Sequence, residues 1–143
     1  MAGWNFEYTI DVDTVNRIVT EKIFGVWKEE TARSFVEEYE KEVADLIDQP
    51  WVRLCDLSNW KTATPEVINI IGRHLRWCRE HNMAWSVNII DNPVTYGQLQ
   101  RMFDKGGTRE ISRTFRDRKE GEKFLRDKGF STNGAPSGTP FRR

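Results

Sequence analysis

The stretch WVRLCDLSNWKTATPE, residues 51–66, decides the fold class. Its first part, residues 51–57, is a compact apolar run that predicts a central β-strand. A polar loop follows, and Thr64-Pro65-Glu66 then supplies an N-cap residue, a proline suited to the first helical turn and a first-turn acid. The stretch therefore predicts a strand, a loop and a helix in succession, which is typical of an α/β protein.

The residues before this stretch predict a β-hairpin and a helix. Apolar residues alternate with polar ones over 4–10, and a β-branched run over 15–24 follows a polar break at 11–14. We expect these two strands to pair as an antiparallel hairpin. Over 28–47, apolar residues recur at gaps of three and four, which predicts an amphipathic helix. Eight acidic and three basic residues over 28–48 give this segment a net charge of minus five.

The residues after the stretch predict two further strands, each followed by a helix. The helix that begins after Thr64 extends to about residue 81, and alternating apolar residues predict a strand over 85–89. Asp91-Asn92-Pro93 repeats the cap-and-proline signal of a helix start, and this helix ends near Phe103, before a turn at Gly106-Gly107.

The last elements are a short edge strand over 111–115 and a helix that begins after Asp117. The predicted order is thus β-β-α-β-α-β-α-β-α, with parallel strands wherever a helix connects them. Residues 1–130 are expected to form a single domain, and residues 131–143, which are rich in Ser, Thr, Gly and Pro, a disordered tail.

The predicted fold is α/β, a two-layer α+β arrangement with a mixed five-stranded sheet and helices mainly on one face. The position of the helices is inferred from Ser86 and Asn88, which alternate with apolar residues in the strand over 85–89. A strand covered on both faces would be continuously apolar, so the other face is expected to be partly open. The predicted core contains Phe35, Tyr39, Val43, Leu54, Ile71, Leu75, Val87 and Ile89.

Composition excludes several classes of protein. The chain has 143 residues, which fits one domain, and 22 basic residues balance 22 acidic ones, so the global basic excess of a nucleic-acid-binding protein is absent. No window approaches 18 apolar residues, and the N-terminus has no basic start followed by an apolar run, so neither a membrane span nor a cleaved signal is expected. Cys55 and Cys78 lie in apolar contexts, which indicates a reducing, cytoplasmic location.

The element order, with Asp56-Leu57-Ser58 closing the third strand before a short loop and a helix, resembles the STAS domain. Within it, the chain is similar to the SpoIIAA-like group of small bacterial anti-sigma-factor antagonists, over about residues 4–130. The resemblance implies a non-enzymatic regulatory or protein-interaction module of the bacterial cytoplasm that acts through a protein partner.

The same resemblance bears on phosphorylation. Family members that act as phospho-switches carry an Asp-Ser pair at the start of the helix after this loop. Thr64 and Pro65 stand at these positions here, so the hydroxyl of the phospho-acceptor is missing. Glu66 adds a permanent negative charge at the helix N-terminus, where a phosphate would otherwise sit. We therefore expect no phosphorylation switch at this position.

The candidate binding residues lie at the carboxyl edge of the predicted parallel strands, where open α/β sheets place their sites. They are Asp56, Ser58, Asn59, Trp60, Thr62, Thr64, Asp91 and Asn92. Thr64, Asp91 and Asn92 either cap their helices or help to bind an anion there. Trp60 either covers the core or contacts a partner. If residues 56–64 form a binding loop, Trp60 contacts the partner. Trp60→Ala is then expected to abolish capture of that partner and to leave the melting temperature nearly unchanged.

Other chemistry has weaker support in the sequence. His74, Cys78 and His81 have a helical spacing that suits a zinc ion, but a fourth ligand is missing and Cys78 falls in the apolar stripe, so no metal is expected. No nucleophile elbow or glycine-rich phosphate loop is present, which predicts no catalytic residues and no cofactor. The alternative is a small-molecule-binding protein or small enzyme at the same edge, with Asp56 and Asp91 cooperating in a cleft.

The charge distribution along the chain and the edge of the predicted sheet both bear on possible partners. Residues 101–128 carry ten bases and six acids, a net charge of plus four, whereas the helix predicted over 28–47 is acidic. This asymmetry fits either charge-guided docking or a solvated surface, and the interleaved acids disfavour nucleic acid. A homodimer is plausible, because the first strand is expected at the edge of the sheet.

Overall fold

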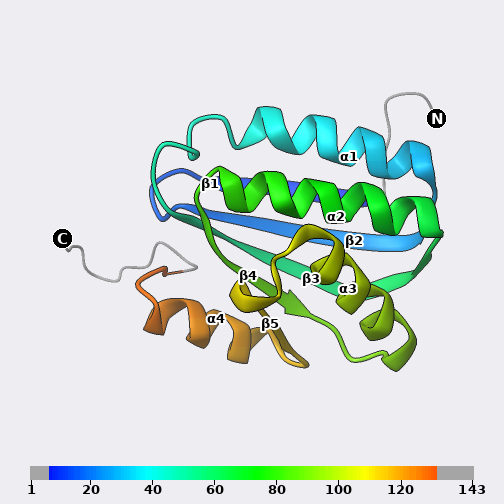
Figure 1. Ribbon diagram of the computed structural model, residues 1–143. Coiled ribbons are helices and arrows are strands. Elements are labelled where there is room, and N and C mark those ends of the chain that lie inside the picture. The colour runs from blue at the N-terminus through cyan, green and yellow to red at the C-terminus, as the bar shows by residue number, and fades with distance from the viewer. Residues whose placement is uncertain (1–6, 132–143) are drawn as a thin grey trace.

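The computed structural model describes residues 7–131, which form a five-stranded mixed sheet with helices on both faces (Figure 1). The strands lie side by side in the order of the sequence, with β1 antiparallel to β2 and the remaining neighbours parallel. They are β1 (Tyr8–Asp13), β2 (Ile18–Trp27), β3 (Trp51–Ala63), β4 (Met83–Ile89) and β5 (Ser112–Phe115). The predicted α/β fold and mixed five-stranded sheet are confirmed.

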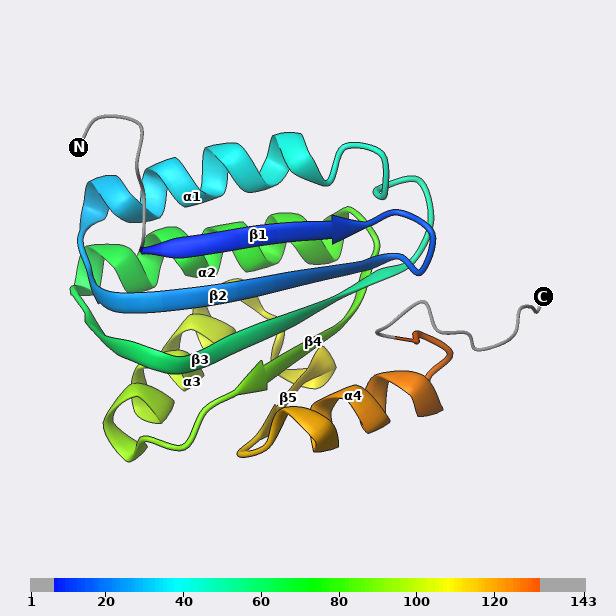
Figure 2. The same cartoon turned by 180° about the vertical axis from the view of Figure 1, so that it is seen from behind.

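The helices are distributed unequally between the two faces of the sheet. The helices are α1 (Glu29–Glu42), α2 (Pro65–Glu80), α3 (Pro93–Gly106) and α4 (Arg118–Asp127), with a short 3₁₀ helix at Arg109–Ile111. Three of them, α1 to α3, lie on one face, and α4 lies on the other beside β3, β4 and β5 (Figures 1 and 2). Seen from behind, β1 and β2 have no helix in front of them (Figure 2). The helices are therefore mainly on one face, as predicted.

The hairpin of β1 and β2 turns later than predicted. β1 continues through Asp11 to Asp13, and the turn occupies residues 14–17. Asp13 accepts hydrogen bonds from the backbone N–H groups of Val15 and Asn16, at 3.1 and 2.9 Å, which fixes this turn. The polar residues at 11 and 13 fall on alternate positions of the strand, so they do not interrupt it. Trp4 and Phe6, expected in the first strand, lie outside the described residues.

Arg17 ties this turn to the segment after α1. Its backbone is left-handed, with φ of 61°, and its guanidinium donates hydrogen bonds to the carbonyl oxygens of Leu46, Gln49 and Pro50. These carbonyls belong to turns, because α1 ends at Glu42 rather than near residue 47. Leu46 is still fully buried, so the apolar spacing reports burial correctly but overestimates the length of the helix.

The polar residues of β4 face the interior, contrary to prediction. Ser86 and Asn88 are fully buried on the face covered by α1 to α3, where both accept hydrogen bonds from Arg53. The alternate residues Val87 and Ile89 pack with residues of β2 and β3 and with Leu125 of α4. Both faces of β4 are therefore covered, and the expected open face is wrong at this strand. Alternation shows which residues share a face, whereas hydrogen-bonding partners decide whether polar ones can be buried.

A close contact between two glycines joins α2 and α3. A Cβ atom on Gly72 would lie 2.5 Å from Cβ of Lys105, and one on Gly106 would lie 2.5 Å from the carbonyl oxygen of Gly72. Only glycine leaves room for this approach of two helix backbones. Gly106 is the last residue of α3 and has no left-handed conformation. Gly107, which follows it with φ of +66°, is the C-cap of this helix.

All eight residues of the predicted core are buried in the structure, Leu75 among them. Leu75→Ala should therefore lower the free energy of unfolding by about 2–5 kcal/mol, because it removes buried apolar atoms and leaves a cavity. Urea denaturation measures this loss. Val15→Ala is the control, since Val15 is 87% exposed and its truncation should change stability by less than about 0.5 kcal/mol. An equally small loss for Leu75→Ala would show that the buried face of α2 is misassigned.

Candidate functional site

The segment expected to be a binding loop is an extension of β3. β3 pairs with β4 only as far as Asp56, but it stays paired with β2 as far as Ala63, opposite Trp27. Residues 57–63, here called the β3 extension, thus have a strand on one side only. Two register shifts interrupt their pairing with β2, and Gly25 of β2, with φ of +71°, lies between them. The predicted loop is wrong because β2 continues past Gly25 and supplies a partner strand.

The polar residues of the β3 extension are held by local hydrogen bonds. The Asp56 carboxylate accepts from both the backbone N–H, at 3.0 Å, and the hydroxyl of Ser58. Gln98 of α3 donates to the Thr62 hydroxyl at 2.9 Å and accepts from the Ala63 N–H at 3.1 Å. Asn59 is exposed. The amide of Gln98 therefore fastens the end of β3 to α3, a connection that sequence spacing did not indicate.

Trp60 lies in the core. Its side chain is only 5% exposed, packs with the apolar residues under α1 to α3, and donates its indole N–H to the carbonyl oxygen of Thr62 at 3.1 Å. Of the two interpretations of this residue, the structure supports the one in which it covers the core. The expectation that Trp60→Ala would leave stability nearly unchanged is therefore wrong.

The helix-capping interpretation holds for two of the candidate residues. The Thr64 hydroxyl accepts from the Val67 N–H at 3.3 Å at the start of α2, and the Asn92 side chain accepts from the Val94 N–H at 2.8 Å at the start of α3. Asp91 is exposed beside Asn92. Both border a hollow of about 380 Å³ at the ends of β4 and β5, together with Tyr96 and Arg116. Asp91 borders this hollow, but Asp56 is not among the residues that line it, so the two acids do not share this cleft.

Exposed apolar side chains accompany these polar residues at the same edge. Val26 at the end of β2 is 50% exposed, and Val94 and Tyr96 at the start of α3 are 67% and 44% exposed. Val94 lies one helical turn before Gln98, on the side of α3 that contacts the β3 extension. The remaining large apolar side chain exposed in the described part of the chain is Val15, in the hairpin turn at the opposite end.

The zinc alternative has no support in the described residues. No three His, Cys, Asp or Glu side chains between residues 7 and 131 are grouped so that they could hold a metal ion. His74 and Cys78 are both buried, with Nε2 of His74 3.6 Å from Sγ of Cys78, whereas the His81 ring stacks on Trp77. Burial lowers the pKa of the His74 imidazole to about 3, and it raises the pKa of the Cys78 thiol well above its usual value. Both groups are therefore uncharged parts of the core.

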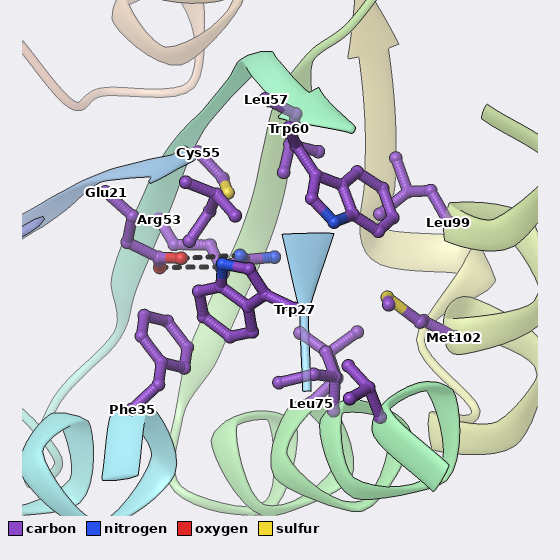
Figure 3. Close-up of a pocket in the computed structure, with 13 residues that line it drawn as sticks. Glu21, Trp27, Phe35, Arg53, Cys55, Leu57, Trp60, Leu75, Leu99 and Met102 are labelled. Atoms are coloured by element: carbon purple, nitrogen blue, oxygen red, sulfur yellow. Dashed lines mark hydrogen bonds and ion pairs between the residues drawn. The ribbon is translucent and has the colours of Figure 1, made fainter. Parts of the chain in front are cut away.

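A buried ion pair is the feature that the sequence analysis missed. Arg53 of β3 donates from Nε and Nη2 to the two carboxylate oxygens of Glu21 on β2, at 2.8 and 2.6 Å (Figure 3). The Tyr39 hydroxyl of α1 also donates to this carboxylate, at 2.6 Å, and Nη1 of Arg53 donates to Ser86 and Asn88 of β4. The network therefore joins α1 to three strands in the interior.

The electrostatics of the network follow from this geometry. Burial alone would raise the pKa of Glu21, but the charge and hydrogen bonds of Arg53, with the hydrogen bond from Tyr39, lower it below its usual value. Burial and the neighbouring Glu21 carboxylate raise the pKa of Tyr39. The pair therefore stays ionised and the phenol stays neutral. The charges of the pair stand in predicted strands, but Lys22 lies next to Glu21 and Asp56 lies near Arg53, so charge alone does not mark the pair in the sequence.

No family model matches this sequence, and no curated protein matches it. Solved structures do share its fold. An uncharacterised DUF3478-family protein from Shewanella loihica PV-4, described as having a SpoIIAA-like fold, matches with a TM-score of 0.63 at 14% identity, over 87% of this chain and 98% of that one. The anti-sigma factor antagonist SpoIIAA, in its unphosphorylated form, matches with a TM-score of 0.60 at 10% identity, over 86% of this chain and 99% of that one. The chain therefore has a SpoIIAA-like fold, as the STAS resemblance implied.

The network predicts a specific pattern of stability in a double-mutant cycle. Glu21→Leu and Arg53→Met should each lower the free energy of unfolding by about 3–5 kcal/mol, because each leaves one buried charge unpaired. The double variant should lose less than either single variant, since it leaves neither charge behind. Urea denaturation of the four proteins tests this. Losses that simply add would show that the two side chains act independently.

His74 predicts a pH dependence of stability. The unfolded chain binds a proton at this imidazole below about pH 6.5, whereas the folded chain does so only near pH 3. Stability contributed by the neutral imidazole is therefore present above pH 6.5 and falls as the pH decreases, by up to about 1.4 kcal/mol per pH unit. From pH 7 to pH 5 the loss at this site should be about 2 kcal/mol.

Urea denaturation at several pH values measures this slope. His74→Gln should remove it, and His81→Gln, which keeps His74, should retain it. Equal slopes in the wild-type protein and His74→Gln would contradict the assignment. The comparison is clearest above pH 5, because Glu21 begins to lose its contribution only below about pH 4.5, its ordinary pKa.

Proposed function

We propose that this chain is a non-enzymatic regulatory module of the bacterial cytoplasm that binds a protein partner through the carboxyl edge of its sheet. This edge comprises the exposed part of the β3 extension, the start of α2 and the start of α3. The shared fold with the anti-sigma factor antagonist SpoIIAA supports the general class of function. Because fold alone does not determine function, the proposal depends on the residues of this chain.

The observation that carries the proposal is the mixture of side chains at the edge. Val26, Val94 and Tyr96 are exposed there beside the small polar residues around Asn59 and Asn92. Apolar side chains that remain exposed among polar ones are typical of protein-binding surfaces, and tyrosine is enriched among residues that dominate binding energy. With Trp60 buried, Tyr96 and Val94 take the place of Trp60 as the proposed central contacts.

The same edge offers little for catalysis. The hydroxyls of Ser58, Thr62 and Thr64 all participate in local hydrogen bonds. Both histidines of the chain lie on α2 or at its end, away from these hydroxyls in the sequence. The Asp56 carboxylate lies within hydrogen-bonding reach of the Ser58 hydroxyl, but no other described side chain of the edge bonds to that carboxylate and orients it as a catalytic triad requires. Binding is therefore preferred over the alternative of a small enzyme.

Phosphorylation control at the start of α2 is not part of the proposal. Pro65 is the first residue of α2 and has no hydroxyl, and Thr64 beside it already serves as the N-cap. Glu66 supplies a negative charge in the first turn. We propose that this helix N-terminus is permanently in one electrostatic state, so that the partner does not depend on a phosphate there.

Self-association, membrane spanning and nucleic-acid binding are not part of this proposal. β1 pairs with β2 on one side and with no described strand on the other, so a homodimer through this edge stays a prediction. No helix among residues 7–131 has both the length and the apolar character needed to cross a bilayer. Acidic and basic side chains are interleaved along α4 and its neighbours, which disfavours nucleic-acid binding.

Photo-crosslinking in cells of the native host tests the proposal. A crosslinking amino acid at position 94 or 96 should capture a discrete partner, whereas the same group at Val15, exposed at the opposite end, should not. Excess unlabelled wild-type protein should compete with this capture, and a Val94→Glu/Tyr96→Glu variant of unchanged melting temperature should not. Equal capture from position 15, or full competition by the double variant, would show that the edge is not the binding surface.

A further inference from the structure

The interior of the protein contains a cavity of about 40 Å³ between the sheet and helices α1 to α3 (Figure 3). Cores are normally packed as densely as organic crystals, so an unfilled space of this size needs an explanation. It exceeds the 10–15 Å³ or so that one water molecule needs. Its apolar walls include Trp27 and Phe35 on one side, Leu75 below, and Trp60, Leu99 and Met102 on the other.

One wall of the cavity is polar, and it is formed by the Glu21–Arg53 pair. A guanidinium group has five N–H donors. Nε and one N–H of Nη2 bond to Glu21, and Nη1 bonds to Ser86 and Asn88. Arg53 lines the cavity and retains one N–H, the second of Nη2, without an acceptor among residues 7–131, and the carboxylate beside it neutralises the positive charge.

The wall formed by Trp60 is the one whose backbone is held least. Trp60 belongs to the β3 extension, which has a strand on one side only and two register shifts in that pairing. Its other attachment is the amide of Gln98 at Thr62 and Ala63. Met102 beside it is unbranched and adapts readily to different shapes. Displacement of Trp60 and Met102 would enlarge the cavity without disturbing the ion pair.

We infer that this cavity is a binding site for a small neutral molecule that has an apolar body and one hydrogen-bond acceptor, such as a ketone. The apolar walls favour a hydrocarbon body, and the free N–H of Arg53 favours an oxygen acceptor. An anion is disfavoured, because Glu21 already compensates the guanidinium and a second buried carboxylate would remain uncompensated. The site is internal, so its ligand does not occupy the exposed side chains of the partner-binding edge, although Trp60 and Leu99 belong to elements that form both.

Binding of cyclopentanone to the full-length protein tests this inference. Methylenecyclopentane has nearly the same shape without the oxygen, and cyclopentanecarboxylate adds a charge. In ¹⁵N–¹H spectra, cyclopentanone should shift the indole signals of Trp27 and Trp60 in a saturable manner and leave those of Trp77 and Trp85 unchanged. Methylenecyclopentane should bind at least about fivefold more weakly, as expected for loss of one hydrogen bond, and the carboxylate should not bind.

Variants of α3 locate the site. Leu99→Phe should fill the cavity and abolish the shifts, whereas Val94→Phe, on the same helix but exposed, should retain them. Met102→Ala should enlarge the cavity and tighten binding of cyclopentanone. This variant tests the location of the site if Leu99→Phe does not fold. The inference is overturned if cyclopentanone causes no saturable shift, if methylenecyclopentane binds equally well, or if Met102→Ala weakens binding in a folded protein.

Discussion

The buried ion pair between Glu21 and Arg53 is the constraint on which the rest of the structure depends. It connects β2 to β3 and, through Tyr39, Ser86 and Asn88, extends to α1 and β4. A slip of one residue in the register of β2 or β3 would move one charge to the opposite face and leave the other unpaired in the interior. The pair need not add much to net stability, since burying two charges is costly. Its effect is to penalise every other register, which selects one arrangement of strands beneath the helices.

Local patterns in the sequence were sufficient to predict most of this fold. Apolar spacing located α1 and the core residues, whereas cap signals located the starts of the other three helices. Thr64, Asn92 and Asp117 are recognisable as caps because capping depends on neighbours within one turn. The ends of β1 and α1 differ from the prediction by a few residues, and the larger errors concern contacts between distant segments. The length of β3 depends on β2 continuing past Gly25, and the burial of Ser86 and Asn88 depends on a guanidinium from another strand. No local pattern contains these partners, and each strand carries charges of both signs, with Lys22 beside Glu21 and Asp56 near Arg53, so the pairing cannot be recognised from charge alone.

The sequence predicts where in the fold the candidate residues lie, but not how their side chains are arranged there. The carboxyl edge does gather the ends of β3 and β4 and the starts of two helices, as topology requires. Its polar residues mostly bond to one another or cap helices, and the large apolar side chains exposed there are Val26, Val94 and Tyr96. The solved structures with this fold share only 14% and 10% of its residues, so these side chains have to be considered on their own chemistry. Trp60 shows the difficulty most clearly, because a tryptophan among polar neighbours looks the same in sequence whether it covers a core or meets a partner.

The contact between Gly72 and Gly106 has a mechanical consequence for the edge. It anchors the C-terminal end of α3 to the middle of α2, where the two backbones touch without intervening side chains. The N-terminal end of α3, with Val94, Tyr96 and Gln98, lies more than a full turn away from this anchor. The part of α3 beyond this contact carries the exposed side chains of Val94 and Tyr96 and the Gln98 amide that bonds to the end of β3. α3 is thus tied to α2 near its C-terminal end and to β3 through Gln98, so these two contacts together set the position of its first turn at the edge.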